Sequence, residues 1–229
     1  MDDKSRYLKL AKARFKESLG EREVYEVEVT GKKFLVYPGV FSPKYFIDTE
    51  FFVLNVPVQK GETFLEIGCG TGVISVLVAQ QGADVTATDI NPVAVQNTKE
   101  NAARYGVNEQ MTVLLGNLFG PVAGNKYDSI FWNMPFNRTQ DKSPSIEELA
   151  IVDPGDRFKT EFIQKARLHL KPNGRLLLGF SSNYGNSELL EKLLDENGFA
   201  WRILAEKEAD FNSDVMRLEL IEARPGEGS

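Results

Sequence analysis

The stretch FWNMPFNR, at 131–138, places an amide side chain, a proline and an aromatic ring directly after a short apolar run. The Asn133 amide can donate and accept hydrogen bonds, and Pro135 restricts the backbone of the residue before it. If the apolar run is a strand of a parallel sheet, these residues lie at the edge where doubly wound folds bind ligands. A plain turn uses the same residue types, so the motif alone favours a turn.

A glycine loop upstream changes that balance. The stretch TFLEIGCGTGV, at 63–73, brings Gly68, Gly70 and Gly72 to the expected turn from a strand to a helix. Glycines let a ligand approach the backbone where any Cβ would collide. The dinucleotide fingerprint requires a third glycine where this chain has Val73, which argues against NAD and leaves another adenosine-bearing ligand.

An acidic residue ends the next expected strand. Asp89, in ATDINP, stands where a carboxylate can accept hydrogen bonds from both hydroxyls of a ribose. Asp is also a common helix N-cap, but Asn91 followed by Pro92 already supplies the cap and the first helical residue. The sequence therefore predicts that Asp89 is available for a ligand.

The elements that would position these residues alternate along the chain. Apolar strand-like runs and helical patterns take turns from Thr63 onward, which is typical of crossover units around a parallel sheet. The expected strands are TFLEI, ADVTATD, MTVLL, YDSIFW, GRLLLGF, WRILAEK and VMRLELIEA, and the expected helices are 73–80, 92–105, 158–170 and one in SELLEKLLDENGF. The polar segment 137–157 is predicted to be a long loop, functional or mobile.

The first 47 residues are predicted to form an appendage. Residues 1–20 read as an amphipathic helix with Leu8, Ala11, Phe15 and Leu19 on its apolar side, and 23–37 read as a β-hairpin around Thr30 and Gly31. The other helix face carries Arg6, Lys9, Lys12, Arg14 and Lys16. A solvated face is the favoured interpretation, over a contact for RNA or for an acidic partner.

The whole chain limits the classes of function. Its 229 residues fit one domain, 48–223, after the appendage 1–47 and before a polar tail, 224–229, that is expected to be disordered. A net charge of -6 provides no global basic field for polyanions. One cysteine and one histidine, His169, offer no metal site, and His169 is expected to be a packing or surface residue. No signal or membrane-spanning pattern is present, so a cytoplasmic protein with no membrane and no metal is expected.

Taken together, EIGCGTG and ATDINP resemble the cofactor motifs of class I S-adenosylmethionine-dependent methyltransferases. The resemblance implies a mostly parallel, doubly wound seven-stranded α/β sheet with a reversed final strand. It implies that Glu66 steadies the methionine end of the cofactor and that Asp89 holds the ribose. Asn117 replaces the acid that often accepts a bond from adenine, and an amide oxygen can accept the same bond. The implied cofactor site comprises Thr49, Glu66, Gly68, Cys69, Gly70, Gly72, Asp89, Ile90, Asn117, Leu118 and Asn133, with the Cys69 thiol packing rather than reacting.

The stretch NMPF resembles the Asn-Pro-Pro-aromatic signature of methyltransferases that act on planar nitrogen. The resemblance implies a catalytic set of Asn133, Met134, Pro135 and Phe136, in which the Asn133 oxygen and a following backbone carbonyl accept two N–H bonds while Phe136 covers the flat face. Met134 departs from the signature, but the accepting carbonyl belongs to the backbone and survives the change. Because the proton leaves after attack, no strong base is needed. Holding a weak nucleophile in line supplies several kcal/mol, up to roughly 7–11 in well-oriented models.

The segment PGVFSPKYFIDTEFF resembles the region before the core in HemK-like glutamine methyltransferases and in small-domain methyltransferases of ribosomal RNA. The resemblance implies that Thr49 touches the methionine end of the cofactor, while Asp48 is also a plausible cap for a helix start. The favoured acceptor is a protein glutamine amide, as in the modification of a release factor, with a translation factor as partner. The alternatives are an exocyclic amine of adenine or guanine in RNA or DNA, and a cofactor-binding protein without catalysis.

Overall fold

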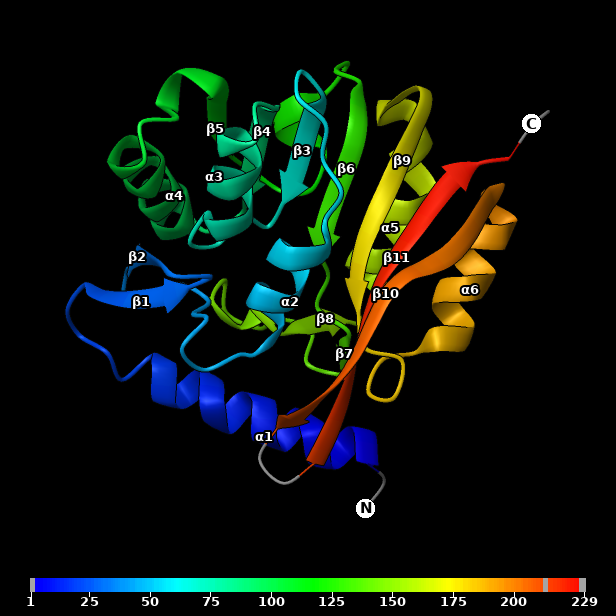
Figure 1. The fold of residues 1–229 in the computed structure, drawn as a ribbon. Coiled ribbons are helices and arrows are strands. Elements are labelled where there is room, and N and C mark those ends of the chain that lie inside the picture. Colours follow the sequence, from blue (N-terminus) through cyan, green and yellow to red (C-terminus); the bar gives the residue numbers. More distant parts are fainter. Residues whose placement is uncertain (1–2, 212–213, 227–229) are drawn as a thin grey trace.

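A computed structural model describes residues 3–211 and 214–226 and centres on a seven-stranded sheet in the order β10-β11-β9-β6-β3-β4-β5 (Figure 1). β11 is antiparallel to both of its neighbours, and the other neighbouring strands are parallel. The predicted doubly wound, mostly parallel sheet with a reversed final strand is therefore confirmed. The strands are β3 (Thr63–Ile67), β4 (Asp84–Asp89), β5 (Met111–Leu115), β6 (Tyr127–Asn133), β9 (Leu170–Phe180), β10 (Phe199–Phe211) and β11 (Asp214–Pro225).

Helices cover both faces of this sheet, with α2 and α3 in front of the strands in Figure 1 and α5 behind them. The Asn91 side chain caps α4 by accepting from the amide of Val93 at 2.9 Å, and Pro92 is the first helical residue, as predicted. Asn186 caps α6 by the same chemistry. The helices are α2 (Asp48–Asn55), α3 (Val73–Gln80), α4 (Pro92–Arg104), α5 (Arg157–Ala166) and α6 (Ser187–Glu196), with single 3₁₀ turns η1 (Asn108–Gln110), η2 (Gly120–Val122) and η4 (Arg167–His169).

The N-terminal helix and hairpin form as predicted, as α1 (Asp3–Ser18), β1 (Tyr25–Val29) and β2 (Lys32–Val36). Thr30 and Gly31 take positive φ, which suits the tight turn of a hairpin. The buried stripe of α1 is Tyr7, Ala11 and Phe15, all within the same apolar core as the sheet. Leu19, predicted on the apolar side, is 42% exposed, because the helix ends at Ser18 before it.

The segment 137–157 folds into a small structure of its own. β7 (Asn137–Thr139) pairs in parallel with β8 (Val152–Pro154), and the turn η3 (Glu148–Ala150) lies between them. The buried Asn137 amide donates to the carbonyl of Ile151 at 2.9 Å and ties the two ends together. Farther on, the buried Lys159 ammonium pairs with Asp156 at 3.0 Å. The prediction of a long loop was therefore wrong over these two strands.

The long strands β10 and β11 run past the rest of the sheet to α1, which lies across their lower ends in Figure 1. The Phe211 ring lies 5.4 Å from that of Tyr7, and Arg6 pairs with Asp214 at 3.1 Å. At the other end of β11, Arg224 and Pro225 continue the strand instead of opening a disordered tail, since the Arg224 guanidinium binds Glu222 at 2.8 Å. The tail residues 227–229 lie outside the described residues.

Candidate active site

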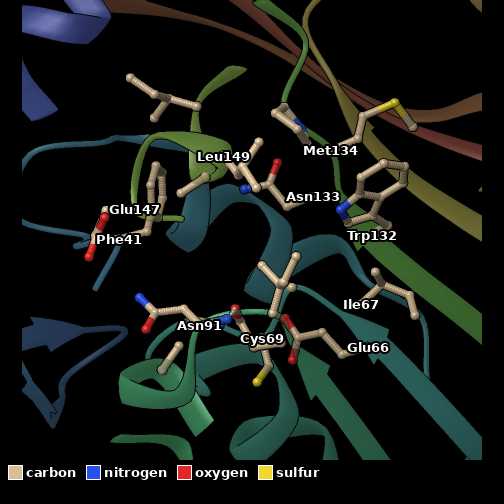
Figure 2. A pocket seen from close by; sticks show the side chains of 18 of the residues that line it. Phe41, Glu66, Ile67, Cys69, Asn91, Trp132, Asn133, Met134, Glu147 and Leu149 are labelled. Carbon is tan, nitrogen blue, oxygen red and sulfur yellow. Dashed lines mark hydrogen bonds between the residues drawn. The ribbon is translucent and has the colours of Figure 1, made fainter. Parts of the chain in front are cut away.

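A cavity lies at the carboxyl ends of β3, β4 and β6, between α1, α2 and the segment with η3. It is lined by the predicted residues Thr49, Glu66, Gly68, Cys69, Gly70, Asp89, Ile90, Asn117, Leu118, Asn133, Met134, Pro135 and Phe136. Figure 2 shows Asn133 and Met134 on its upper side and Glu66, Cys69 and Asn91 on its lower side. The glycine-loop motif and the NMPF motif, far apart in sequence, therefore face one space.

Gly72 is the predicted site residue that does not line this cavity. It takes φ +76 at the N-terminus of α3, and a Cβ on it would lie 2.7 Å from the Thr98 methyl group. Gly72 is thus required for close packing of α3 against α4. Gly68 and Gly70 have φ of +68 and +55, and both line the cavity. The open main chain that a ligand can approach is therefore the part from Gly68 to Gly70.

Asp89 ends β4 beside this loop and is only 9% exposed. Its two carboxylate oxygens accept from the amides of Gly70 at 2.9 Å and Asn91 at 2.8 Å. Burial raises the pKa of this carboxyl above its ordinary value. Each oxygen keeps a second lone pair, so the group can still accept from two hydroxyls of a ligand.

Glu66 lies deeper, at the start of the loop. Its carboxylate accepts from the Ser75 amide at 2.9 Å and from the Ser75 hydroxyl, which fixes the first turn of α3. Burial is the main cause that raises the pKa of Glu66 to about 8. Asp48 is also buried, and burial raises the pKa of its carboxyl as well.

These three acids test whether S-adenosylmethionine fits the cavity. A buried carboxyl is costly to ionise without a compensating partner, and a ligand that carries sulfonium and ammonium charges would supply one. The ribose hydroxyls of such a ligand could donate to Asp89, and its adenine could approach Asn117 and Leu118. The residue before these two, Gly116, donates its amide to the Asp89 carbonyl at 2.9 Å and so keeps them beside the end of β4. The donor set and the open main chain fit the cofactor.

At the other end of the cavity, Asn133 closes β6 and contacts α2. Its amide nitrogen donates to a carboxylate oxygen of Asp48 at 2.9 Å. The second Asp48 oxygen is buried and has no hydrogen-bond partner among residues 3–211 and 214–226. Asp48 is the first residue of α2 rather than its cap, because its side chain turns to Asn133. The predicted capping role was wrong, and Thr49 beside it lines the cavity.

Aromatic rings surround the residues that follow Asn133. The Met134 amide donates to the Gly179 carbonyl at 3.3 Å, which holds the backbone of the motif against β9. The Phe136 ring lies 5.6 Å from that of Tyr7 and 6.2 Å from that of Phe180. α1 therefore supplies one wall of the cavity beside the NMPF motif.

Several lining residues had no prediction from sequence. Tyr7 and Ala11 come from α1, Phe41 and Phe46 from the segment before α2, and Glu147 and Leu149 from the segment between β7 and β8. Their sequence patterns are those of ordinary packing or surface residues. Trp132 also lines the cavity, and its place directly before Asn133 was the one available signal.

Two residues behave as the sequence predicted. The Cys69 thiol is buried and accepts from the Thr98 hydroxyl at 3.3 Å, and burial raises its pKa, which disfavours the reactive thiolate and agrees with a packing role. His169 is buried, and its ring stacks on Phe119 with 4.4 Å between centroids. In the described parts of the chain, no group of three or more His, Cys, Asp or Glu side chains could hold a metal ion, and no helix is long and apolar enough to cross a membrane.

Known proteins are similar to this chain in sequence and in fold. Residues 31–202 match the methyltransferase small domain family. A release factor glutamine methyltransferase of Aquifex aeolicus (strain VF5) is 32% identical over 203 residues, which cover 82% of this chain and 72% of that protein. A ribosomal RNA small subunit methyltransferase C of Alcanivorax borkumensis is 30% identical over 66% of this chain and 43% of its own length.

A solved ribosomal protein L11 methylase of Lactobacillus delbrueckii subsp. bulgaricus has the same fold, with a TM-score of 0.60, 20% identity and coverage of 83% of this chain and 84% of that one. The match to the small domain extends over most of the strands that form the cavity, from β2 into β10. The chain therefore belongs to the methyltransferase small domain family, within the class I S-adenosylmethionine-dependent methyltransferases.

Proposed function

We propose that this methyltransferase acts on a planar nitrogen and that its acceptor is the side-chain amide of a protein glutamine. The observation that carries the proposal is the Asn133 amide, which lies in the same cavity as the glycine loop and Asp89. The Asn133 amide, which can hold the N–H groups of a methyl acceptor, thus faces the space where the methyl donor fits. The relative from Aquifex aeolicus is named a glutamine methyltransferase, which supports the same acceptor.

Bound S-adenosylmethionine supplies a methyl group on a positively charged sulfur. The residues of the chain supply the orientation of the acceptor. The Asn133 side-chain oxygen and the Met134 carbonyl accept the two N–H bonds of the amide, and Phe136 lies against its flat face. With the hydrogens held, the nitrogen lone pair points at the methyl carbon, and alignment of this kind can supply several kcal/mol, up to roughly 7–11 in well-oriented models. The proton leaves only after the nitrogen becomes cationic, so no strong base is required before attack.

The proposed partner is a protein, with a translation factor as the first candidate. The relative from Aquifex aeolicus is named for release factors. The cavity beside the NMPF motif is walled by Tyr7 and Ala11 of α1. The chain is acidic, which does not favour a polyanion. These features support a protein acceptor.

The second candidate acceptor is an exocyclic amine of RNA. Lys9, Lys12 and Lys16 are exposed on α1, and no carboxylate of the described residues lies within salt-bridge distance of them. The relative from Alcanivorax borkumensis is named a ribosomal RNA methyltransferase. An RNA acceptor predicts transfer that weakens steeply with salt and on neutralising these lysines, because phosphate contacts release counterions.

Incubation with S-adenosylmethionine labelled in its methyl group and a fractionated cell extract tests the acceptor. We expect the label in a protein fraction, lost to protease and kept after ribonuclease, and located on glutamine by mass spectrometry. Asn133→Ala should lower transfer by at least about a hundredfold, while the cofactor affinity measured by calorimetry stays within about threefold. Label that is sensitive to ribonuclease would instead establish the RNA acceptor. Tight cofactor binding without transfer to any fraction would favour a binding protein without catalysis.

A further inference from the structure

The contact between Asp48 and Asn133 has no part in the function proposed above. The Asn133 amide nitrogen donates to Asp48 at 2.9 Å across the gap between β6 and α2. We infer that Asp48 is a positioning residue, which fixes the Asn133 amide with its oxygen toward the acceptor. This inference rests on the proposed function, in which that oxygen accepts an N–H bond.

The chemistry of the two groups determines which end of the Asn133 amide faces Asp48. An amide side chain has two ends of similar size, one that donates and one that accepts, and a half-turn about its last bond exchanges them. An ionised carboxylate only accepts, so Asp48 pairs with the nitrogen and excludes the exchanged form. The Asn133 oxygen then has no hydrogen-bond partner among the described residues, and it remains available for an acceptor.

The neighbouring strand leaves room for this orientation. Gly179 of β9 pairs with Asn133 in the sheet, and a Cβ on Gly179 would lie 2.9 Å from the Asn133 oxygen. The same Cβ would lie 2.7 Å from the Phe52 ring, which belongs to α2 like Asp48. The amide is thus held by α2 at its nitrogen, and the absence of a side chain at Gly179 leaves room for its oxygen.

A structural role does not account for Asp48. The residue is 7% exposed, it does not cap α2, and its second oxygen has no partner among residues 3–211 and 214–226. Burying a carboxyl with no cation beside it costs stability that an apolar residue in its place would not cost. The groups near its charge are Tyr7 from α1, Asn133 from β6 and the adjoining Thr49, and none of these is a cation. The Asn133 amide is the hydrogen-bond partner that another element of the described chain brings to this costly group.

Two variants on the same helix provide the test. Asp48→Asn keeps the shape but allows the Asn133 amide to turn, and Glu50→Gln makes the same change of charge at an exposed position of α2. The assay uses methyl-labelled S-adenosylmethionine and a concentration series of the protein fraction that contains the methyl acceptor. We expect Asp48→Asn to lower the maximal rate of methyl transfer at least about tenfold. The amount of acceptor fraction that gives half of the maximal rate, and the affinity for the cofactor, should each change by less than about threefold. Glu50→Gln should match the unchanged protein in all three.

A second readout needs no acceptor. In protein labelled with ¹⁵N at asparagine, the Asn133 side-chain pair should show one strongly hydrogen-bonded proton that exchanges slowly with solvent. Asp48→Asn should speed that exchange at least about tenfold, and Glu50→Gln should leave it unchanged. A full rate together with an unaltered amide pair in Asp48→Asn would overturn the inference, as would equal losses of rate and cofactor binding, which mark a structural role. If Asn133→Ala keeps its activity, the proposed function fails instead.

Discussion

Three carboxyl groups of this molecule, Asp48, Glu66 and Asp89, lie in one cavity with little water around them. Burial raises the pKa of each, because the charged form loses its hydration and has no cation to replace it. The cavity is thus electrostatically incomplete by itself and suits a cationic ligand. The protonation of these carboxyl groups should therefore make the stability of the protein depend on pH.

Glu66→Gln tests that dependence. Glu66 has an ordinary pKa of 4.5 and a pKa of about 8 in the folded chain, so the folded state holds a proton that the unfolded state releases between these values. Its contribution to stability is full below about pH 4.5 and is lost as the pH rises toward 8, by up to about 1.4 kcal/mol per pH unit. We expect the stability of Glu66→Gln, measured by urea unfolding, to fall less over that window. Glu191→Gln, at an exposed position, should show the same dependence of stability on pH as the unchanged protein. If Glu66→Gln shows that same dependence too, the pKa of Glu66 is not raised in the folded chain.

Gly179→Ala tests the fit around the Asn133 amide. The new methyl group would lie 2.7 Å from Phe52 and 2.9 Å from the Asn133 oxygen, so either the ring or the amide must move. We expect a loss of about 1–3 kcal/mol in the free energy of unfolding and a drop in methyl transfer. Gly120→Ala is the control, since a Cβ there meets nothing within 4 Å. Equal stability and activity of the two variants would show that Asn133 has more space than the packing indicates.

Among the elements, those of the central sheet could be predicted closely from the sequence. TFLEI, MTVLL and the helix 73–80 form β3, β5 and α3 with the predicted bounds. These segments are apolar runs bounded by glycine or polar residues, and the local pattern is enough to define them. The glycine loop, Asp89 and Asn133 could be placed on one edge because parallel strands bring their carboxyl ends together.

Other elements could not be predicted because distant contacts determine them. Tyr7 lines the cavity only because β10 and β11, about two hundred residues later, extend to α1. β7 and β8 are three residues each and pair with one another across a polar segment, too short to leave a periodic signal. The orientation of Asn133 by Asp48 likewise joins residues 85 positions apart.

Tyr7→Ala tests the part that α1 plays in the cavity wall. Tyr7 is 2% exposed, and its ring stacks on Tyr184 with 4.0 Å between centroids. Removing the ring should cost about 3 kcal/mol of unfolding free energy through the lost burial and the space left behind. Thermal and urea unfolding measure this cost, and Lys9→Ala on the exposed face should change stability by less than about 0.5 kcal/mol. A loss as small for Tyr7→Ala would mean that α1 does not pack as described.

For the whole molecule, cofactor binding should be coupled to stability, because the cavity draws on elements from α1 to α5. At one hundred times its Kd, S-adenosylmethionine should add about 2.7 kcal/mol, which raises Tm by about 5–10 °C for a chain of this size. Asp89→Ala should abolish most of the rise, and exposed Asp84→Ala should keep it. An unchanged Tm at saturating cofactor, measured by calorimetric scanning, would contradict binding in this cavity.

The position of β11 has a consequence for how this chain is made. β11 follows β10 in sequence, yet it lies between β9 and β10 in the sheet. As the polypeptide leaves the ribosome, β9 and β10 emerge with the place between them empty and their facing edges unpaired. The sheet is complete only when the strand from Asp214 onward has been synthesised. A nascent chain that stalls just before this strand would therefore present two unpaired strand edges to chaperones.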